Sequence, residues 1–568
     1  MSFAALSIKG RFTAPPAVAR RFVQLAVLAA IHLAAIGIML RTEVGLVEQA
    51  AFALTWGLIY FFWLAVLRRP AISAALTLGM FVILILLSQF KYNVLMTTVT
   101  FVDVMIVDSD TLSFLMMIFP GLGWKVAIAA LIVVPTLISI WLLDTWRVRS
   151  WVASSICATC FVVLAGLSFA IPLDRNDEFW SSNYVSKFAR SGVVATVDLL
   201  TRGVFESDTA VADPLRPAAG GECRLANKPP HIIMIFDESS FDARLMPGIQ
   251  VPPDYPRQFL SFDGKARSFV VEGASGPSWF TEYNVLTGLS VRSYGRFAES
   301  VTRIASGRIE RGLPHTLRRC GYSTFSLYPW TGAFLSARGF QTTAGIEHFL
   351  DAKDMGTRQS EPDSFYYDFA LRLIAREQSR GPLFLFVYTA ANHFPWSVRY
   401  RPELAPDWRD PGNWFDIDEY LRRQSMSAKD YEQLVARLAK EFPDESFLLV
   451  RFGDHQPLFA KFFIEPDLDQ TAVARQIAQF DPRYFTTYYA IDTVNFRPAD
   501  LSSALDTLDA PYLPLVVLEA AGVPLDASFA EQKTILQRCR GLFYLCADGA
   551  EARRFNRQLM DAGLIKGF

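Results

Sequence analysis

Three apolar runs in the second half of the chain end in side chains that can bind a metal ion. HIIMIF is followed by Glu238, LFLFVYT by His393, and SFLLVRF by Asp454 and His455. Carboxylates and imidazoles are common ligands of divalent cations. The carboxyl ends of parallel strands meet at one edge of a sheet, so the pattern predicts a single metal site there. The competing interpretation of each acid is a helix cap.

A candidate nucleophile lies in the stretch SGPSWFTEYNVLTGLS, which begins at Ser275. Ser278 follows a Gly-Pro turn and stands where a helix should begin. Backbone N–H groups at a helix N-terminus bind phosphate or sulfate, and a nearby cation would help to deprotonate the hydroxyl. The alternative is that Ser278 only caps the helix.

The elements that must position these groups alternate between β-rich runs and amphipathic helical stretches. The runs SFVVEG, YSTFSLY and TTYYAI join the three above, and YEQLVARLAKEF has apolar residues at helical spacing. This alternation predicts, for residues 230–568, an α/β domain with a largely parallel sheet sandwiched by helices. Residues 173–229 contain the Pro/Gly/Ala-rich ESDTAVADPLRPAAGG and are expected to form a linker with membrane-proximal helices.

The first 172 residues are expected to form a membrane domain. Five apolar runs have the length needed to cross a hydrocarbon core as helices, and their recurrence argues against a cleaved signal peptide. The runs are Phe22–Leu40, Val47–Leu67, Ala71–Phe90, Val126–Leu143 and Trp151–Ile171. Residues 101–120 are apolar but contain Asp103, Asp108 and Asp110, which favours an interfacial helix or a re-entrant element over a sixth span.

Charge and cysteine placement predict the orientation. Basic residues precede the first span and follow the second and fourth, so these loops are expected in the cytoplasm. The N-terminus would then be cytoplasmic and the last domain periplasmic, in a multi-pass protein of the bacterial inner membrane. The net charge of -1 and the absence of a basic block argue against nucleic-acid binding.

Four cysteines fall in the exported part, an even number suited to an oxidising compartment. The short loop CRGLFYLC favours a bridge between Cys539 and Cys546, which leaves Cys223 with Cys320, although three pairings are possible.

Together these motifs resemble the alkaline phosphatase and sulfatase superfamily. Within it, the chain is similar to the membrane-anchored phosphoglycerol transferases, such as lipoteichoic acid synthase, and to the related phosphoethanolamine transferases. The resemblance of HIIMIFDESS and RFGDHQP implies that Glu238, Asp454 and His455 bind the metal together with Ser278. TAANHFPW matches the region whose histidine contacts the phosphate, which implies that role for His393.

Two family spacings select Ser278 as the nucleophile. In the transferases the catalytic Thr stands four residues before a Glu, and here Ser278 stands four before Glu282. In sulfatases the modified residue stands nine before the Thr of a Thr-Gly pair, and here Ser278 stands nine before Thr287. Formylglycine formation is not expected, because Phe280 and Glu282 occupy the positions where the family has Pro and Arg.

The headgroup pocket departs from the family. In SLYPWTGAFLSARGF the His, Trp and Arg of the glycerol-phosphate site align with Tyr328, Leu335 and Ala337, and Arg338 is one place further on. The residues expected to contact substrate are Tyr328, Trp330, Arg338 and Glu282.

The resemblance implies a phosphotransferase with one divalent cation, Mn²⁺ favoured and Mg²⁺ or Zn²⁺ possible. A phospho-headgroup, phosphoglycerol favoured, would pass from phosphatidylglycerol or phosphatidylethanolamine through a phosphoserine to an envelope glycan or glycolipid. The alternatives are a phosphoethanolamine transferase, a metal-dependent phosphodiester or sulfate ester hydrolase, and a non-enzymatic scaffold.

Overall fold

The computed structural model describes residues 17–95, 97–105, 115–116, 121–173, 181–211, 213–215, 223 and 228–566. The chain packs as two compact units. One contains the N-terminal helices up to Val194, and the other contains the residues from Ala195 onwards together with short pieces that precede the fourth apolar helix.

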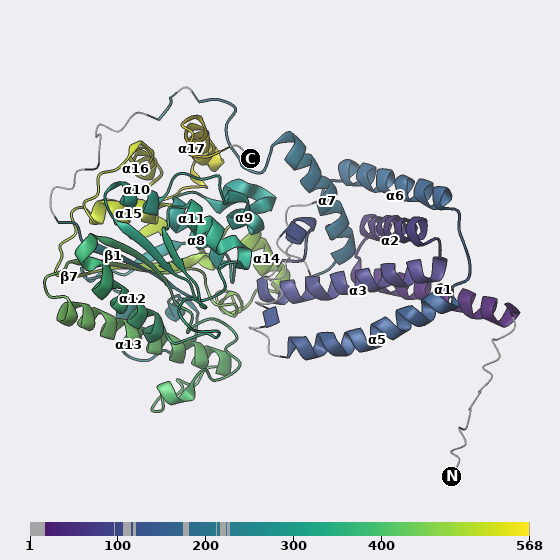
Figure 1. Ribbon diagram of the computed structural model, residues 1–568, viewed down its shortest axis with the longest axis horizontal. Coiled ribbons are helices and arrows are strands. Elements are labelled where there is room, and N and C mark those ends of the chain that lie inside the picture. The colour runs from purple at the N-terminus through teal and green to yellow at the C-terminus, as the bar shows by residue number, and fades with distance from the viewer. Residues whose placement is uncertain are drawn as a thin grey trace, which may run out of the picture. The chain divides into compact units, whose positions relative to one another are not determined.

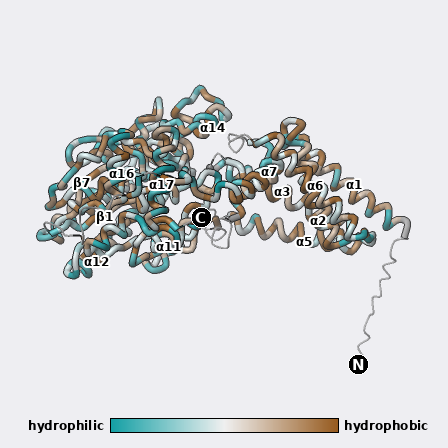
Figure 2. The backbone as a smooth tube through the Cα atoms, turned by 90° about the horizontal axis from the view of Figure 1, so that it is seen from above, coloured by the Kyte–Doolittle hydropathy of each residue, from teal (hydrophilic) through white to brown (hydrophobic). Residues whose placement is uncertain are grey.

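The N-terminal unit contains five helices long and apolar enough to cross a membrane, as expected. The backbone of these helices is coloured mostly brown, for hydrophobic residues, in Figure 2, and the fourth candidate span has none of its residues buried within the protein. The unit's helices are α1 (Ala17–Thr42), α2 (Leu46–Leu67), α3 (Pro70–Leu95), α5 (Leu122–Leu143), α6 (Ser150–Ala170) and the start of α7 (Tyr184–Thr201).

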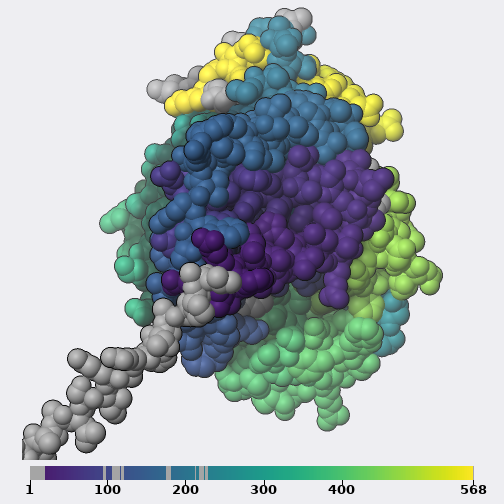
Figure 3. Space-filling view, turned by 90° about the vertical axis from the view of Figure 1, so that its right-hand side faces the viewer, coloured from purple at the N-terminus to yellow at the C-terminus, as the bar shows by residue number. Residues whose placement is uncertain are grey.

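Polar side chains fix the ends of these helices. The Asp144 carboxylate accepts hydrogen bonds from the backbone N–H groups of Ala71 and Ile72 at 2.7 and 3.0 Å, and so caps α3. Gln24 donates to the same carboxylate at 2.6 Å. Helix α2 packs along α6, and the purple and blue N-terminal residues form one continuous body in Figure 3.

The C-terminal unit is built on one eight-stranded sheet in the order β4-β3-β5-β1-β6-β7-β2-β8. Strand β7 runs antiparallel to both of its neighbours, and the remaining pairs are parallel. The strands are β1 (His231–Asp237), β2 (Arg267–Val270), β3 (Ser323–Leu327), β4 (His348–Leu350), β5 (Leu383–Tyr388), β6 (Phe447–Gly453), β7 (Thr486–Val494) and β8 (Thr507–Asp509).

Helices cover both faces of this sheet. Figure 1 shows α12 and α13 on one face and α8, α9, α10, α11 and α15 on the other. Because both faces are covered, β1, β5 and β6 are almost entirely buried apolar runs. The unit's helices are α8 (Ser278–Thr287), α9 (Val301–Ala305), α10 (Leu313–Arg319), α11 (Ala337–Thr343), α12 (Asp363–Glu377), α13 (Phe415–Glu441), α14 (Gln470–Ala478), α15 (Leu513–Ala520), α16 (Ala527–Cys539) and α17 (Ala550–Asp561).

The expected α/β sandwich is therefore confirmed, with β7 as an antiparallel strand inside it. Disulfides join Cys223 to Cys320 and Cys539 to Cys546, the pairing favoured from the sequence.

Parts of the expected interfacial helix and linker lie outside the described residues, Asp108 and Asp110 among them. Within the described part, Phe101–Met105 forms a short 3-10 helix that packs on Val291–Ser300 of the C-terminal unit. Asp103 forms a 2.7 Å ion pair with Lys91. The interfacial position of this segment stays a prediction.

Candidate metal and nucleophile site

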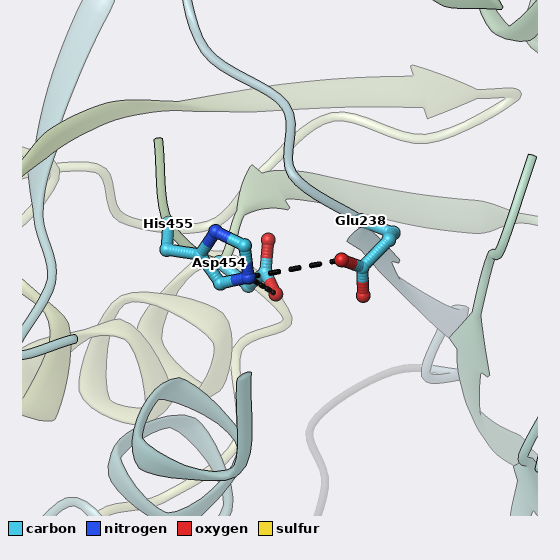
Figure 4. A group of neighbouring side chains, drawn as sticks. All are labelled: Glu238, Asp454 and His455. Carbon is cyan, nitrogen blue, oxygen red and sulfur yellow. Dashed lines mark ion pairs between the residues drawn. The ribbon is translucent and has the colours of Figure 1, made fainter. Parts of the chain in front are cut away.

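Strands β5, β1 and β6 lie side by side and parallel, so their carboxyl ends meet at one edge of the sheet. Glu238 follows β1 directly, and Asp454 and His455 follow β6. Figure 4 shows the three side chains directed toward one another. Nε2 of His455 lies 3.3 Å from an Asp454 carboxylate oxygen and 3.7 Å from Oε1 of Glu238. One ligand atom from each residue falls within 4.8 Å of the others, so the three could hold one metal ion.

A glycine at the end of β6 allows the loop after β1 to pass close to this strand. Gly453 is the last residue of β6 and is paired in register with Asp237 of β1. A Cβ atom at position 453 would lie 1.8 Å from the carbonyl oxygen of Ser240, so only glycine fits at this position. The backbone N–H of Ser239 then donates to Oδ1 of Asp454 at 2.7 Å, which ties the two loops together.

Ser278 is the first residue of α8, at the positive end of the helix dipole. Its hydroxyl oxygen lies 3.2 Å from Nε2 of His455. The helix is held in this position because Thr281, one turn further on, donates to the backbone carbonyl of Asp454 at 2.6 Å. The hydroxyl is therefore directed at the cluster of acids and imidazole.

The electrostatics of the cluster favour a cation. Burial raises the pKa of Asp454 to about 7, and burial together with the neighbouring Asp454 raises the pKa of Glu238. Oδ2 of Asp454 is buried without a hydrogen-bond partner among the described residues. Two buried acids beside an imidazole are a donor set that fits a divalent cation.

Tyr388 is a site residue that the sequence did not reveal. It is the last residue of β5, and its hydroxyl donates to Oε2 of Glu238 at 3.0 Å. The same hydroxyl also interacts with Ser278. Oε1 of Glu238 accepts a second hydrogen bond from the Ser239 hydroxyl at 2.8 Å. Both oxygens of Glu238 are thus oriented by neighbouring hydroxyls.

His393 lies beside the cluster. It lines a small cavity together with Glu238, Ser275 and His455. Its Nδ1 lies 2.7 Å from the carbonyl oxygen of Phe394, so Nε2 is the ring nitrogen that points away from this backbone group. Burial lowers the pKa of His393, although the nearby Glu238 acts in the opposite direction. Burial therefore favours the neutral imidazole of His393, the form that can accept a proton from a substrate hydroxyl.

The other expected substrate residues occupy different surroundings. Trp330 is buried with its ring edge-on to His393, at a centroid distance of 5.1 Å. Tyr328 is also buried. Glu282 is 2 % exposed and accepts a 3.0 Å hydrogen bond from Gln341. Arg338 instead forms ion pairs with Asp351 and Asp354 at 2.9 and 3.1 Å.

Asp237 points to the opposite face of the sheet from Glu238, as expected from its position one residue earlier in the strand. It accepts a hydrogen bond from Tyr488. Arg451 lies on the same face, 3.7 Å from Asp492 and with its guanidinium 3.8 Å from the centre of the Tyr431 ring. Both residues belong to a buried network beneath α13 rather than to the metal cluster.

Residues 275–476 match the sulfatase family. The matched segment lies within the C-terminal unit. The segment includes Ser278, His393, Asp454 and His455, whereas Glu238 precedes it.

One curated relative is the capsular polysaccharide biosynthesis protein RkpI of Rhizobium meliloti (strain 1021), 29% identical over 215 residues. The match spans 36% of this chain and 37% of RkpI, so it covers little more than a third of that protein.

Two solved structures are similar to this chain at low sequence identity. The Streptococcus pyogenes phosphoglycerol transferase GacH, in complex with sn-glycerol-1-phosphate, is 15% identical with a TM-score of 0.46, covering 61% of this chain and 88% of GacH. The lipooligosaccharide phosphoethanolamine transferase A of Neisseria meningitidis, an integral membrane protein, is 12% identical with a TM-score of 0.42. That match covers 84% of this chain and 95% of the transferase.

Proposed function

We propose that this protein is a metal-dependent phosphotransferase that moves a phospho-headgroup from a membrane phospholipid to an envelope glycan or glycolipid. The observation that carries the proposal is the 3.2 Å approach of the Ser278 hydroxyl to His455, inside a cluster with two buried acids. A hydroxyl at a helix N-terminus beside such a cluster is suited to attack a phosphodiester.

The reaction has two steps. The Ser278 oxygen attacks the phosphorus of the donor, the bond to the diacylglycerol oxygen breaks, and the headgroup phosphate becomes an ester of Ser278. An acceptor hydroxyl then displaces the serine oxygen. His393 gives a proton to the leaving diacylglycerol oxygen and removes one from the acceptor hydroxyl. The N-terminal end of α8 contributes its partial positive charge to the phosphate oxygens.

Glu238, Asp454 and His455 would hold the cation, with Ser278 as a further ligand. A divalent cation there would supply positive charge that favours the serine alkoxide and screens the phosphate. Mn²⁺ is the proposed ion, with Mg²⁺ and Zn²⁺ as alternatives, because two carboxylates and one imidazole suit all three. Tyr388 and Ser239 keep the Glu238 carboxylate in its orientation.

Phosphoglycerol from phosphatidylglycerol is the proposed headgroup and phosphoethanolamine the alternative. The partial match to a capsular polysaccharide biosynthesis protein is compatible with a glycan acceptor. The proposed location is the bacterial inner membrane, with a cytoplasmic N-terminus and a periplasmic sulfatase-family domain. Tyr328, Trp330, Glu282 and Arg338 are proposed to shape the headgroup pocket, although the ion pairs of Arg338 must open before it contacts a phosphate.

The test is headgroup release from labelled phosphatidylglycerol in vesicles. Ser278→Ala should abolish release while the protein stays folded and membrane-bound, and Ser278→Thr should retain a measurable part. Ser275→Ala is the matched control, because the chain should still form a covalent adduct on Ser278. Mass spectrometry of that adduct identifies the headgroup, and free glycerol phosphate formed without added glycan would indicate a hydrolase. Full release by Ser278→Ala would refute the assignment.

A further inference from the structure

The C-terminal unit exposes a group of large apolar side chains near the candidate site. Val398, Trp414, Phe415 and Phe462 are 65, 76, 46 and 43 % exposed, and we call them the aromatic patch. They come from two segments, the chain that follows His393 and the short 3-10 helix that follows His455. Single exposed apolar residues are common on proteins, so only apolar residues that lie close together indicate an interaction surface.

Side-chain contacts connect the patch. The ring of Trp414 packs edge-on against Phe463, with centroids 5.7 Å apart, and Phe463 is the chain neighbour of Phe462. The Arg399 guanidinium lies 5.0 Å from the centre of the Phe415 ring, and Arg399 follows Val398 in the chain. These contacts place the patch residues around the start of α13, where Arg399 is also ion-paired with Asp410 and Glu419.

An apolar layer leads from this surface to the candidate site. Trp396, Leu458 and Phe463 belong to one hydrophobic cluster that is separate from the main core of the domain. Trp396 and Leu458 also line the cavity beside Glu238 and His455. A lipid tail lying against the patch would therefore meet apolar side chains up to the point where its headgroup reaches the cluster.

A buried cation lies directly behind the patch. Lys461 is 2 % exposed, and its ammonium has no hydrogen-bond partner in the part of the chain that the structure describes. Its Nζ lies 5.2 Å from the centre of the Phe462 ring. Burial lowers the pKa of Lys461 to about 7. An unpaired buried ammonium is costly, and an anion delivered to it would offset that cost.

We propose that the aromatic patch docks on the surface of an anionic phospholipid bilayer, where Lys461 receives a lipid phosphate. Trp and Phe side chains favour the boundary between headgroups and hydrocarbon, and lysine is attracted to anionic lipid. The chain's own apolar helices, long enough to cross a membrane, would tether the domain near a bilayer. The inference deepens the proposed function by describing how the donor is reached, and it rests on that function only for the choice of phospholipid.

The test measures lipid contact without turnover. The full chain carries Cys157→Ser and Cys160→Ser, which remove the two free thiols, and a nitroxide is attached through Trp414→Cys. The chain is reconstituted in phosphatidylcholine vesicles with and without phosphatidylglycerol. The matched control is Lys265→Cys, a residue whose side chain is 58% exposed outside the patch. Spin-label relaxation by oxygen, which partitions into lipid, is compared with relaxation by a water-soluble nickel complex.

The label at position 414 should be more accessible to oxygen than to nickel, and the label at 265 should show the reverse. Equal behaviour of the two labels in both vesicle types would overturn the docking. Phosphatidylglycerol should increase the ratio of oxygen to nickel relaxation for the label at 414. Lys461→Met should remove this increase, and an equal increase in the Lys461→Met variant would overturn the role of Lys461. Ser278→Ala should dock like the wild type, so failure of docking and failure of the proposed chemistry are distinguishable.

Discussion

The Tyr388→Phe variant tests whether the hydroxyls around Glu238 control cation binding. The variant removes one oxygen and the 3.0 Å hydrogen bond to Oε2 of Glu238, while the aromatic ring can keep its stacking on Phe236 at 4.0 Å. A hydrogen bond to a charged group contributes about 1.5–3 kcal/mol. Loss of a partner that orients a metal ligand typically weakens metal affinity about 10- to 100-fold, which agrees with that energy.

The assay is isothermal titration of Mn²⁺ into the metal-stripped full chain in detergent, with headgroup release measured in parallel at saturating Mn²⁺. Tyr322→Phe is the matched control, because its hydroxyl donates a 3.0 Å hydrogen bond to the Pro230 carbonyl, outside the cluster. We expect weaker Mn²⁺ binding for Tyr388→Phe and unchanged binding for Tyr322→Phe. Equal dissociation constants for Tyr388→Phe and the wild type would refute the reasoning.

Two further predictions concern stability, measured as thermal unfolding midpoints in detergent. Burial raises the pKa of Glu282 from 4.5 to about 8, so the folded chain retains a proton that the unfolded chain releases. Stability should therefore fall as pH rises between these values, and Glu282→Gln should flatten that fall; an equal slope in both proteins would contradict the buried acid. The Cys223–Cys320 bridge spans 97 residues and Cys539–Cys546 spans 7, which corresponds to about 4.7 and about 2.4 kcal/mol of loop entropy. Replacing the first pair by alanine should lower the midpoint more than replacing the second, and the opposite order would exclude loop entropy as the main effect.

Buried strands and apolar spans were predictable because each leaves a continuous apolar run in the sequence. All six β-rich runs are strands, and all five apolar runs are helices. Strands β4 and β8 were missed because three residues are too few to show a period. The antiparallel direction of β7 was also missed, since a strand buried on both faces has the same composition in either direction.

The site could be predicted only where polar residues interrupt an apolar run. Glu238, Asp454 and His455 follow strands at positions where the composition changes, and the structure brings them together. Tyr388 ends a strand that contains other aromatic residues, so nothing in its local sequence distinguishes a hydroxyl directed at Glu238 from a packed ring. The ion pairs of Arg338 with Asp351 and Asp354 depend on how a later loop returns to α11, which local spacing does not encode.

The close contact between Gly453 and the Ser240 carbonyl determines how near the backbone segments beside the candidate cation site come to each other. The missing Cβ atom at position 453 lets the loop after β1 pass close to the end of β6, and the lengths of the acidic side chains do not alter that backbone arrangement. Attempts to fit a larger ion by exchanging Asp454 for a longer acid would leave that arrangement unchanged. A change of ion size therefore has to begin with the backbone at residues 240 and 453, because even a methyl group at 453 would have to displace the Ser240 carbonyl.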